Sequence, residues 1–169
     1  MATQDLLTYK CKSLGYAEVG TGAKASYTPL MGVLDGLSIS QEAASESAIN
    51  GEFYDTPLDS VGTLGSYKIE FDLVKYKPEE IAAMEGGKFT ASTGLYIMPS
   101  SFTSVYKQFK LEFYNGIDYI VIYKGKVATN WDGTDLKTAP LKLHIVITAL
   151  VADDGKTVEM KMAEPSTGG

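Results

Sequence analysis

Few side chains in this sequence have the types and spacing that catalysis requires. His144 is the sole histidine, and a nucleophilic triad would need it beside a reactive serine. The Gly-x-Ser-x-Gly turn that presents such a serine does not occur in the chain. His144 stands between Lys142 and Val146 in an alternating apolar stretch, so we interpret it as a residue on a sheet face. The sequence therefore predicts that the protein is not an enzyme.

Two glycine-containing segments match phosphate-binding loops only in part. Gly155-Lys156-Thr157 ends like such a loop, but the glycine that the motif needs five residues earlier is Leu150 here. Gly20-x-Gly22 lacks the third glycine and the following helix of a dinucleotide-binding loop. We interpret the first segment as a hairpin turn and the second as a loop, and we predict no cofactor.

The sequence gives equally little support for a metal-binding site or a reactive thiol. Asn130, Asp132 and Asp135 could offer oxygen ligands to calcium, but their spacing does not match the helix-loop-helix calcium motif. An ordinary turn is the interpretation we favour, because Asn and Asp are frequent turn residues. Cys11 is the only cysteine, which excludes an internal disulfide and a cysteine metal site. We interpret it as a small buried side chain, with a reactive thiol as the alternative.

Composition narrows the possible partners. The chain has 169 residues and a net charge of −6, and all 15 of its basic residues are lysine. Without arginine, base readout and tight phosphate binding are not expected. The first residues lack a cationic region followed by an apolar run, and no apolar run reaches membrane-spanning length, so we expect neither a signal peptide nor a membrane partner. We expect a single domain over residues 1–162 and a flexible tail over 163–169.

The longest predicted element is a β-hairpin over residues 106–124. Asn115-Gly116 is typical of a two-residue type I′ turn, which needs positive φ at both residues. With this turn, Tyr114 would face Ile117. Further along, the pairs would be Leu111 with Ile120 and Phe109 with Ile122 on a core face, and Lys110 with Val121 and Glu112 with Tyr119 on the other face.

The remaining pattern indicates a mainly β protein. Alternation predicts strands at Val33–Ser40, Tyr67–Tyr76, Leu141–Val151 and Thr157–Met162, the last closing a second hairpin with Val158, Met160 and Met162 inward. Pro78 and Gly86-Gly87 bound one short helix at about 78–86, which should pack through Ile81 and Met84. Residues 16–26 and 130–140 are expected to be loops. The predicted fold class is a β-sandwich or half-open barrel with long hairpins and one short α-helix.

Residues 41–66 form a long stretch without clear periodicity, which we predict to be a loop. It is acidic, contains no lysine and yet carries several apolar side chains. Such a stretch is either a solvated loop or an interaction element that becomes ordered on binding. The members of interest are Glu42, Glu46, Ile49, Glu52, Phe53, Tyr54, Asp55, Leu58 and Asp59.

The order of these elements resembles the tail tube (major tail) proteins of long-tailed phages. The resemblance covers roughly residues 33–162 and lies in Ile69–Leu73 with the following PEEIAAMEGG, in FKLEFYNGIDYIVIYKGKV and in LKLHIVITALVADDGK. Tube proteins of type VI secretion and contractile injection systems share this fold and are an alternative. Some phage relatives carry a further immunoglobulin-like domain, which we do not expect here.

The resemblance implies a virion protein assembled in the host cytoplasm. Its copies would form stacked, hexameric rings around a channel for DNA, without sequence-specific binding. Implied partners are further copies and the tail terminator, tape measure and baseplate or distal tail proteins. The stretch 41–66 would join rings, and Gln108, Lys110, Glu112 and Tyr119 would line the channel. The remaining alternative is a monomeric β-sandwich that binds a ligand such as a glycan, for which Trp131 and the tyrosines are the relevant side chains.

Overall fold

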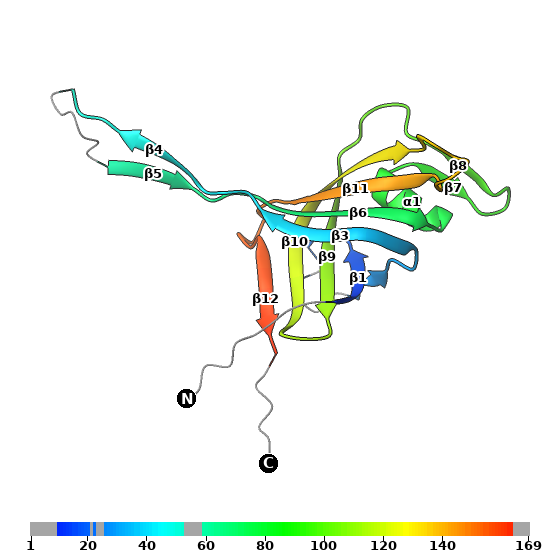
Figure 1. Cartoon of the computed structure of the whole chain (residues 1–169), viewed down its shortest axis with the longest axis horizontal. Coiled ribbons are helices and arrows are strands. Elements are labelled where there is room, and N and C mark those ends of the chain that lie inside the picture. Colours follow the sequence, from blue (N-terminus) through cyan, green and yellow to red (C-terminus); the bar gives the residue numbers. More distant parts are fainter. Residues whose placement is uncertain (1–9, 21, 23–25, 53–58, 164–169) are drawn as a thin grey trace, which may run out of the picture.

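The fold is mainly β and is built on one large antiparallel sheet (Figure 1). This computed structural model describes residues 10–20, 22, 26–52 and 59–163. The strands are β1 (Cys11–Ala17), β2 (Thr28–Pro29), β3 (Val33–Gln41), β4 (Ser45–Ile49), β5 (Asp59–Thr63), β6 (Tyr67–Lys75), β7 (Lys88–Thr90), β8 (Leu95–Ile97), β9 (Val105–Phe113), β10 (Ile117–Asp132), β11 (Lys142–Ala149) and β12 (Val158–Met162), and the helix is α1 (Pro78–Glu85).

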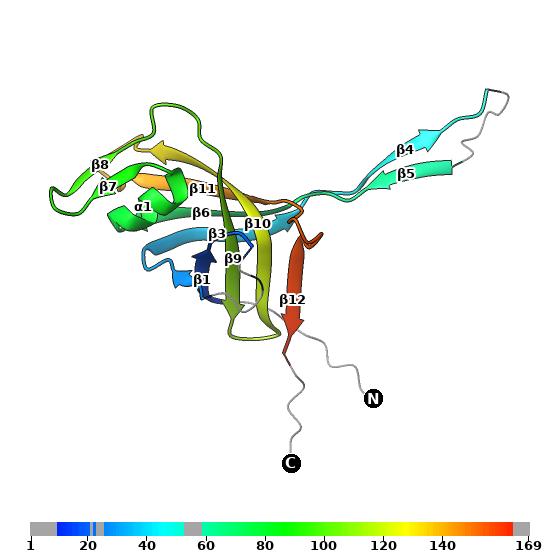
Figure 2. The ribbon, with the colours of Figure 1, turned by 180° about the vertical axis from the view of Figure 1, so that it is seen from behind.

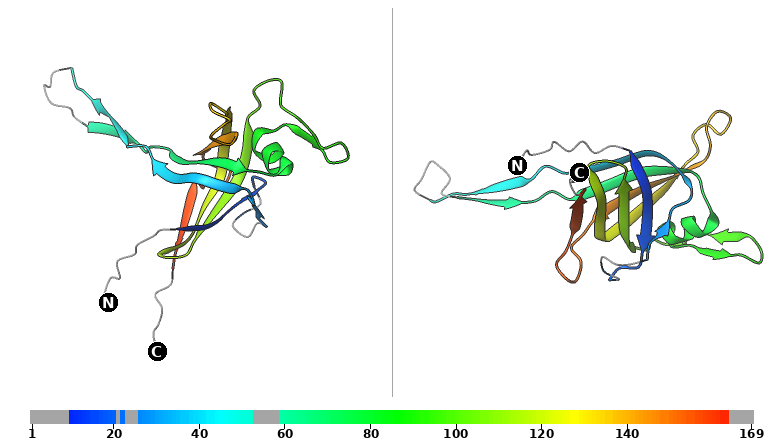
Figure 3. Two further views of the ribbon diagram at one scale, coloured as in Figure 1. Left: turned by 45° about the vertical axis from the view of Figure 1, so that its right-hand side comes forward. Right: turned by 90° about the horizontal axis from the view of Figure 1, so that it is seen from below.

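Strand β10 connects the two halves of the sheet. The strand order is β2-β1-β9-β10-β11-β6-β3, and β12 also pairs with β10. Residues 117–122 of β10 pair with β12, whereas residues 125–132 pair with β11 on the same edge. The ladder between β9 and β10 shifts register between Ile122 and Gly125. A bulge of this kind bends a strand, and Figure 3 shows the sheet curled around one core as a half-open barrel.

The core lies inside this curl, because the strands alternate as the sequence predicts. Ile69, Phe71 and Leu73 of β6 are buried, and Tyr67 packs against them. In the same way β9 buries Phe109 and Leu111. Other core residues are Leu14, Leu30, Ile81, Met84, Ile122, Val127, Leu143, Ile145, Ile147 and Ala149.

Helix α1 closes one end of the barrel, and its predicted buried residues Ile81 and Met84 are confirmed. Proline occupies the first turn, where the missing N–H costs nothing. At the other end Gly86 adopts a left-handed conformation with φ of 81°, and its N–H donates to the carbonyl of Ala82 at 3.0 Å. The sequence therefore predicted both ends of the helix to within one residue.

Several predicted boundaries and pairings are wrong. Tyr16 and Ala17 belong to β1, and β10 continues to Asp132, so both predicted loops are shorter. Strand β12 pairs with β10 and does not form a hairpin with β11. Met160 and Met162 are exposed, contrary to the inward orientation predicted for them. The local alternation of β12 could not reveal its partner, which is distant in the sequence.

Of the predicted tail 163–169, only Ala163 is among the described residues, and its N–H donates to the carbonyl of Gly116 at 3.0 Å. Over the described ranges, no helix has the length and apolar character needed to cross a membrane.

Candidate interaction surfaces

A two-stranded arm projects from the body of the protein (Figures 1 and 2). We use the name arm for residues 42–66, of which 42–52 and 59–66 are described. The sequence predicts a loop here, but β4 and β5 pair as an antiparallel hairpin, with Ser45 opposite Thr63 and Ile49 opposite Asp59. Alternation is weak because neither face of the hairpin is covered, so burial imposes no pattern on the sequence.

Every residue of β4 and β5 is exposed. The exposed side chains include Ile49 at 46%, Val61 at 57% and Leu64 at 83% relative exposure. An isolated two-stranded hairpin is marginally stable in water, and it leaves both outer edges unpaired. The arm therefore has the character of a segment that gains stability when another molecule covers it.

The root of the arm is fixed to the body. The N–H of Glu42 donates to the carbonyl of Ser66 at 3.0 Å, and the side-chain amide of Gln41 donates to the carbonyl of Gly65 at 3.4 Å. A Cβ atom at Gly65 would lie 1.9 Å from the carbonyl oxygen of Glu42, so only glycine fits. Glu42 also pairs with Lys68, and this hydrogen bond lowers the pKa of the Glu42 carboxyl.

The acidic and apolar residues that the sequence analysis named in this stretch are placed as follows. Glu42, Glu46, Glu52 and Asp59 are exposed, as is Ile49. Phe53, Tyr54, Asp55 and Leu58 lie outside the described residues. The described members are thus spread along the arm and are free to meet a partner, apart from the Glu42 carboxylate at its root.

A second exposed surface, which the sequence did not single out as a site, lies at the opposite end of the molecule (Figure 1). We use the name lobe for residues 86–104, which contain β7, β8 and the segment leading to β9. Leu95 and Ile97 on β8 are 60% and 62% exposed. The sequence pattern predicts a strand at Gly94–Met98, which β8 confirms, whereas the three residues of β7 carry too little pattern to be recognised.

The lobe is attached to the helix through Glu85. The Tyr96 hydroxyl donates to one Glu85 oxygen at 2.5 Å, and the Trp131 indole N–H donates to the other at 3.1 Å. Burial, followed by the hydrogen bond to Glu85, raises the pKa of Tyr96. Gly87 allows the Tyr96 ring to lie close, since a Cβ atom there would be 2.2 Å from the ring hydroxyl. The lobe is therefore a fixed surface.

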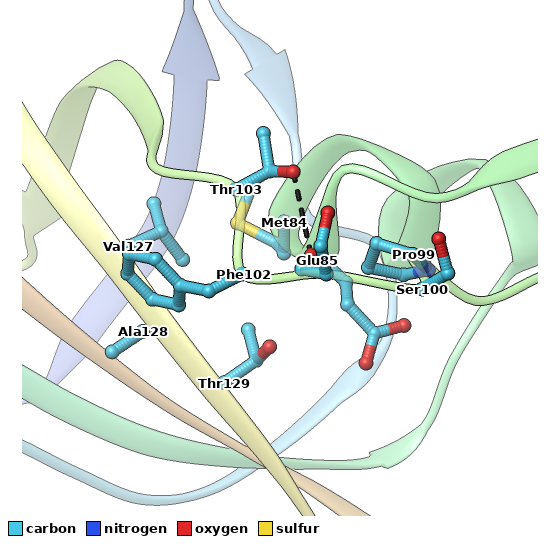
Figure 4. Close-up of a pocket in the computed structure, with 10 residues that line it drawn as sticks. Met84, Glu85, Pro99, Ser100, Phe102, Thr103, Val127, Ala128 and Thr129 are labelled. Carbon is cyan, nitrogen blue, oxygen red and sulfur yellow. Dashed lines mark hydrogen bonds between the residues drawn. The ribbon is translucent and has the colours of Figure 1, made fainter.

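A cleft of about 390 Å³ separates the end of the lobe from β10 (Figure 4). Met84 and Glu85 of α1, residues 99–103 and residues 127–129 line it. Phe102 lies over Val127 and Ala128 in this view, and the Lys126 ammonium is 5.7 Å from the Phe102 ring centroid. The residues that line the cleft offer neither a nucleophile–base pair nor a cluster of metal ligands.

The predicted hairpin pairing is confirmed for four pairs, but the ladder does not include the predicted pair of Tyr114 and Ile117, and the turn differs. Leu111 pairs with Ile120, Phe109 with Ile122, Lys110 with Val121 and Glu112 with Tyr119. Gly116 has a φ of 75°, whereas Asn115 is not among the described residues with positive φ, so the turn is not type I′. The N–H of Ile117 donates to the carbonyl of Asn115 at 3.0 Å, which is the bond of a γ-turn centred on Gly116.

The residues predicted to line a channel share the face of β9 and β10 opposite the core, but one of them is buried. Gln108 is 0% exposed because Gly22 and Tyr27 cover it and accept hydrogen bonds from its amide. The prediction for Gln108 as a surface residue is therefore wrong. Its cover comes from a segment more than 80 residues earlier, which strand alternation alone could not indicate.

Lys110, Glu112 and Tyr119 remain partly exposed on this face. The Lys110 ammonium lies 3.2 Å from a Glu112 oxygen and 4.7 Å from the Tyr119 ring centroid. The Ser13 hydroxyl donates to the other Glu112 oxygen at 3.0 Å. The hydrogen bonds from Lys110 and then Ser13 lower the pKa of Glu112. The exposed part of this face is thus polar and its charges are locally balanced, whereas Val121 and Tyr123 on the same face are buried.

The other side chains considered for catalysis, metal binding or thiol chemistry contact residues of the same chain. His144 pairs across the strands with Asp72, the two side chains being 2.7 Å apart at Nδ1 and Oδ1. Asp132 accepts hydrogen bonds from the hydroxyl and N–H of Thr134, and these lower its pKa. Cys11 is half-buried, and burial raises the pKa of its thiol. Within the described residues there is no group of three metal-ligating side chains.

Gly155 closes a turn over residues 152–155, but the prediction of a hairpin turn is wrong, because β12 pairs with β10 and not with β11. The N–H of Gly155 donates to the carbonyl of Ala152 at 2.9 Å, and Gly155 has a φ of 82°. The Lys156 ammonium lies 5.1 Å from the Tyr123 ring centroid. In this position the lysine packs on an aromatic ring of its own chain, and the segment does not open a helix.

Comparison of the sequence with protein-family models and with curated proteins finds no match. These comparisons therefore assign no family, and functional inference depends on the surfaces described above.

Proposed function

We propose that this chain is a structural protein whose copies form the stacked rings of a phage tail tube, with six copies in each ring. The observation that carries the proposal is the arm, a hairpin exposed over both faces of β4 and β5. Because its root is fixed to the body and its strands are uncovered, the arm can extend from one subunit and contact a neighbouring subunit. Burial of Ile49, Val61 and Leu64 by that neighbour would supply the free energy of the joint.

The edges of the large sheet support association within a ring. Among the described strands, β3 pairs only with β6, and β12 pairs only with β10. Strand β2 likewise has a single neighbour, β1. Unpaired edges tend to associate with other strands, and a closed ring of copies hides them through one repeated, heterologous contact.

The polar face of β9 and β10 is the surface that we assign to the channel, without Gln108. Lys110 and Glu112 neutralise each other there. The chain as a whole carries a charge of −6 and no arginine. Such a channel would repel DNA weakly and let it slide, because few cations are available for tight phosphate contacts.

The partners that follow from this assignment are further copies of the chain, a tail terminator, a tape measure protein and the distal tail or baseplate proteins. The tube of a contractile injection or type VI secretion system would use the same surfaces and remains the second assignment.

Trp131 disfavours the glycan-binding alternative, because its indole donates to Glu85 and its ring packs edge-on against Tyr76 at 5.5 Å.

Electron microscopy of the purified protein tests the proposal directly. We expect tubes from the wild-type chain. Replacing residues 45–63 with a short Gly/Ser turn keeps the bond between Glu42 and Ser66 and the pairing of β3 with β6, so this variant should fold but form no tubes. As a control, a Gly/Ser replacement of the exposed residues 133–139 should leave tubes intact.

The opposite results would contradict the proposal. If the variant without residues 45–63 still formed tubes, the arm would not be needed for assembly. A wild-type chain that stays monomeric at high concentration, and whose melting temperature rises with a sugar ligand, would instead favour the binding module.

A further inference from the structure

The outer face of the lobe has a defined chemical character. Lys88 pairs with Ile97 and Thr90 with Leu95, while the alternate residues Phe89 and Tyr96 form the other face. Lys88 is the only charged residue in 86–104. This face therefore combines two exposed aliphatic side chains with one exposed positive charge.

One face of the arm has the complementary character. Because side chains alternate, Ile49, Val61 and Asp59 share a face of the hairpin, together with Ser45, Ser47 and Thr63. The other face carries the smaller or more polar residues Glu46, Ala48, Ser60 and Gly62. The arm contains five acidic residues and no lysine, so its net charge is negative.

We propose that the arm of one copy docks on the lobe of another copy, with Ile49 and Val61 against Leu95 and Ile97, and Asp59 near Lys88. This inference rests on the proposed self-association and names the surface that receives the arm. Apolar burial stabilises such a contact, and opposite charges select the partner and the orientation. Both elements are two-stranded sheets that can cover one another's exposed faces.

The position of the two surfaces requires that the contact joins different copies. The arm leaves one end of the body and the lobe lies at the other end, in all views of the molecule (Figures 1, 2 and 3). The arm consequently points away from the lobe of its own chain. Strands β4 and β5 have five residues each and span roughly 17 Å, and Figure 1 shows them extending clear of the body, where a neighbour can contact them.

Cysteine cross-linking between two different chains tests the contact. In a Cys11→Ser background, one variant carries Val61→Cys and the other carries Leu95→Cys. Mixed under mild oxidation, the two should form a covalent dimer that neither forms alone. Asp153→Cys replaces Leu95→Cys in the control, since the Asp153 side chain is 99% exposed but lies in the turn before β12. This control should give no dimer with the arm variant.

Charge exchange provides a second measurement. Asp59→Lys and Lys88→Glu should each raise the concentration needed for assembly by about two- to fivefold, the factor expected for loss of one exposed ion pair. The double variant should assemble at the wild-type concentration. If the two substitutions acted at unrelated surface positions, their separate effects on the assembly concentration would instead add. Wild-type chains and the Cys11→Ser background serve as references for folding and assembly.

The outcomes separate this inference from the proposed function. If tubes form but the arm cysteine links to another arm or to no lobe cysteine, the docking surface is wrong and the tube assignment is unaffected. A cross-link between arm and lobe in a sample without tubes would retain the docking contact and overturn the tube. A monomer that gives no cross-link overturns both.

Discussion

At the scale of single residues, Glu80 joins the start of α1 to the segment that leads into β3. Its carboxylate is buried and accepts hydrogen bonds from the N–H groups of Met31 and Gly32 as well as from Lys77. Its place in the first turn is itself favourable, because the N-terminal end of a helix is positive. Its burial depends on residues almost fifty positions away, so helix capping rules could not predict it.

Removing this carboxylate should destabilise the fold. Glu80→Ala leaves three backbone donors without their acceptor, at a cost of about 1–3 kcal/mol in the free energy of unfolding. Glu79→Ala is the matched control, because Glu79 is the exposed neighbour in the same turn, and it should change stability by less than about 0.5 kcal/mol. Chemical denaturation of the unassembled chain measures both. Equal effects of the two substitutions would contradict this account of Glu80.

Gly125 permits the close packing at the bend of β10. A Cβ atom there would lie 2.6 Å from Ile147 Cγ2 and 2.8 Å from Phe109 Cδ2, and both neighbours are fully buried. Gly125→Ala should therefore cost about 1–3 kcal/mol through overpacking. Gly62→Ala is the control, since its nearest neighbour would be 3.9 Å away. Unchanged thermal melting of Gly125→Ala would show that the bend tolerates a side chain.

Glu112 should contribute a pH-dependent part of the stability. Its pKa is lower in the folded chain than the value of about 4.3 in an unfolded one. The contribution is therefore present above about pH 4.3 and is lost as the pH falls through the folded pKa. Glu112→Gln should reduce the loss of stability between neutral and acidic pH, and Ser13→Ala should reproduce part of the effect. Identical pH profiles for wild type and Glu112→Gln would contradict this.

At the scale of elements, the sequence predicted the parts whose pattern is imposed by burial on one face. Strands β3, β6, β9, β10 and β11, the helix and the pairing of β9 with β10 follow from alternation and from glycine and proline positions. The arm was missed as a hairpin because both its faces are exposed. The partner of β12 was missed because long-range pairing leaves no local signal.

The hairpin turn allows the observed geometry to be tested against the type I′ prediction. Gly116→Val should lower stability, because a β-branched residue is strained at a φ of 75°. Asn115→Val should be tolerated much better, since Asn115 does not adopt a left-handed conformation. A type I′ turn would instead penalise both substitutions. Thermal melting of the two variants distinguishes these turns, and tube formation by Gly116→Val tests whether assembly needs the register.

At the scale of the whole molecule, the body and the arm should differ in stability. Free subunits should exchange the amide hydrogens of 42–52 and 59–66 quickly, because the hairpin is uncovered. Once the chain polymerises, exchange in these segments should slow, while β6 and β11 exchange slowly in both states and provide the internal reference. Arm amides that are already protected in the free subunit would contradict its ordering by a partner.

The pairing of β1 with β9 also constrains how the chain folds during synthesis. Leu14 lies opposite Leu111, so the first strand has no place in the sheet until most of the polypeptide has been made. Strands β3 and β6 and helix α1 can associate earlier, because they are closer in sequence. The nascent chain must therefore carry β1 without its β9 partner, with only the two-residue β2 available to pair with it, through much of translation, and β12 docks on residues that preceded it by about 40 positions.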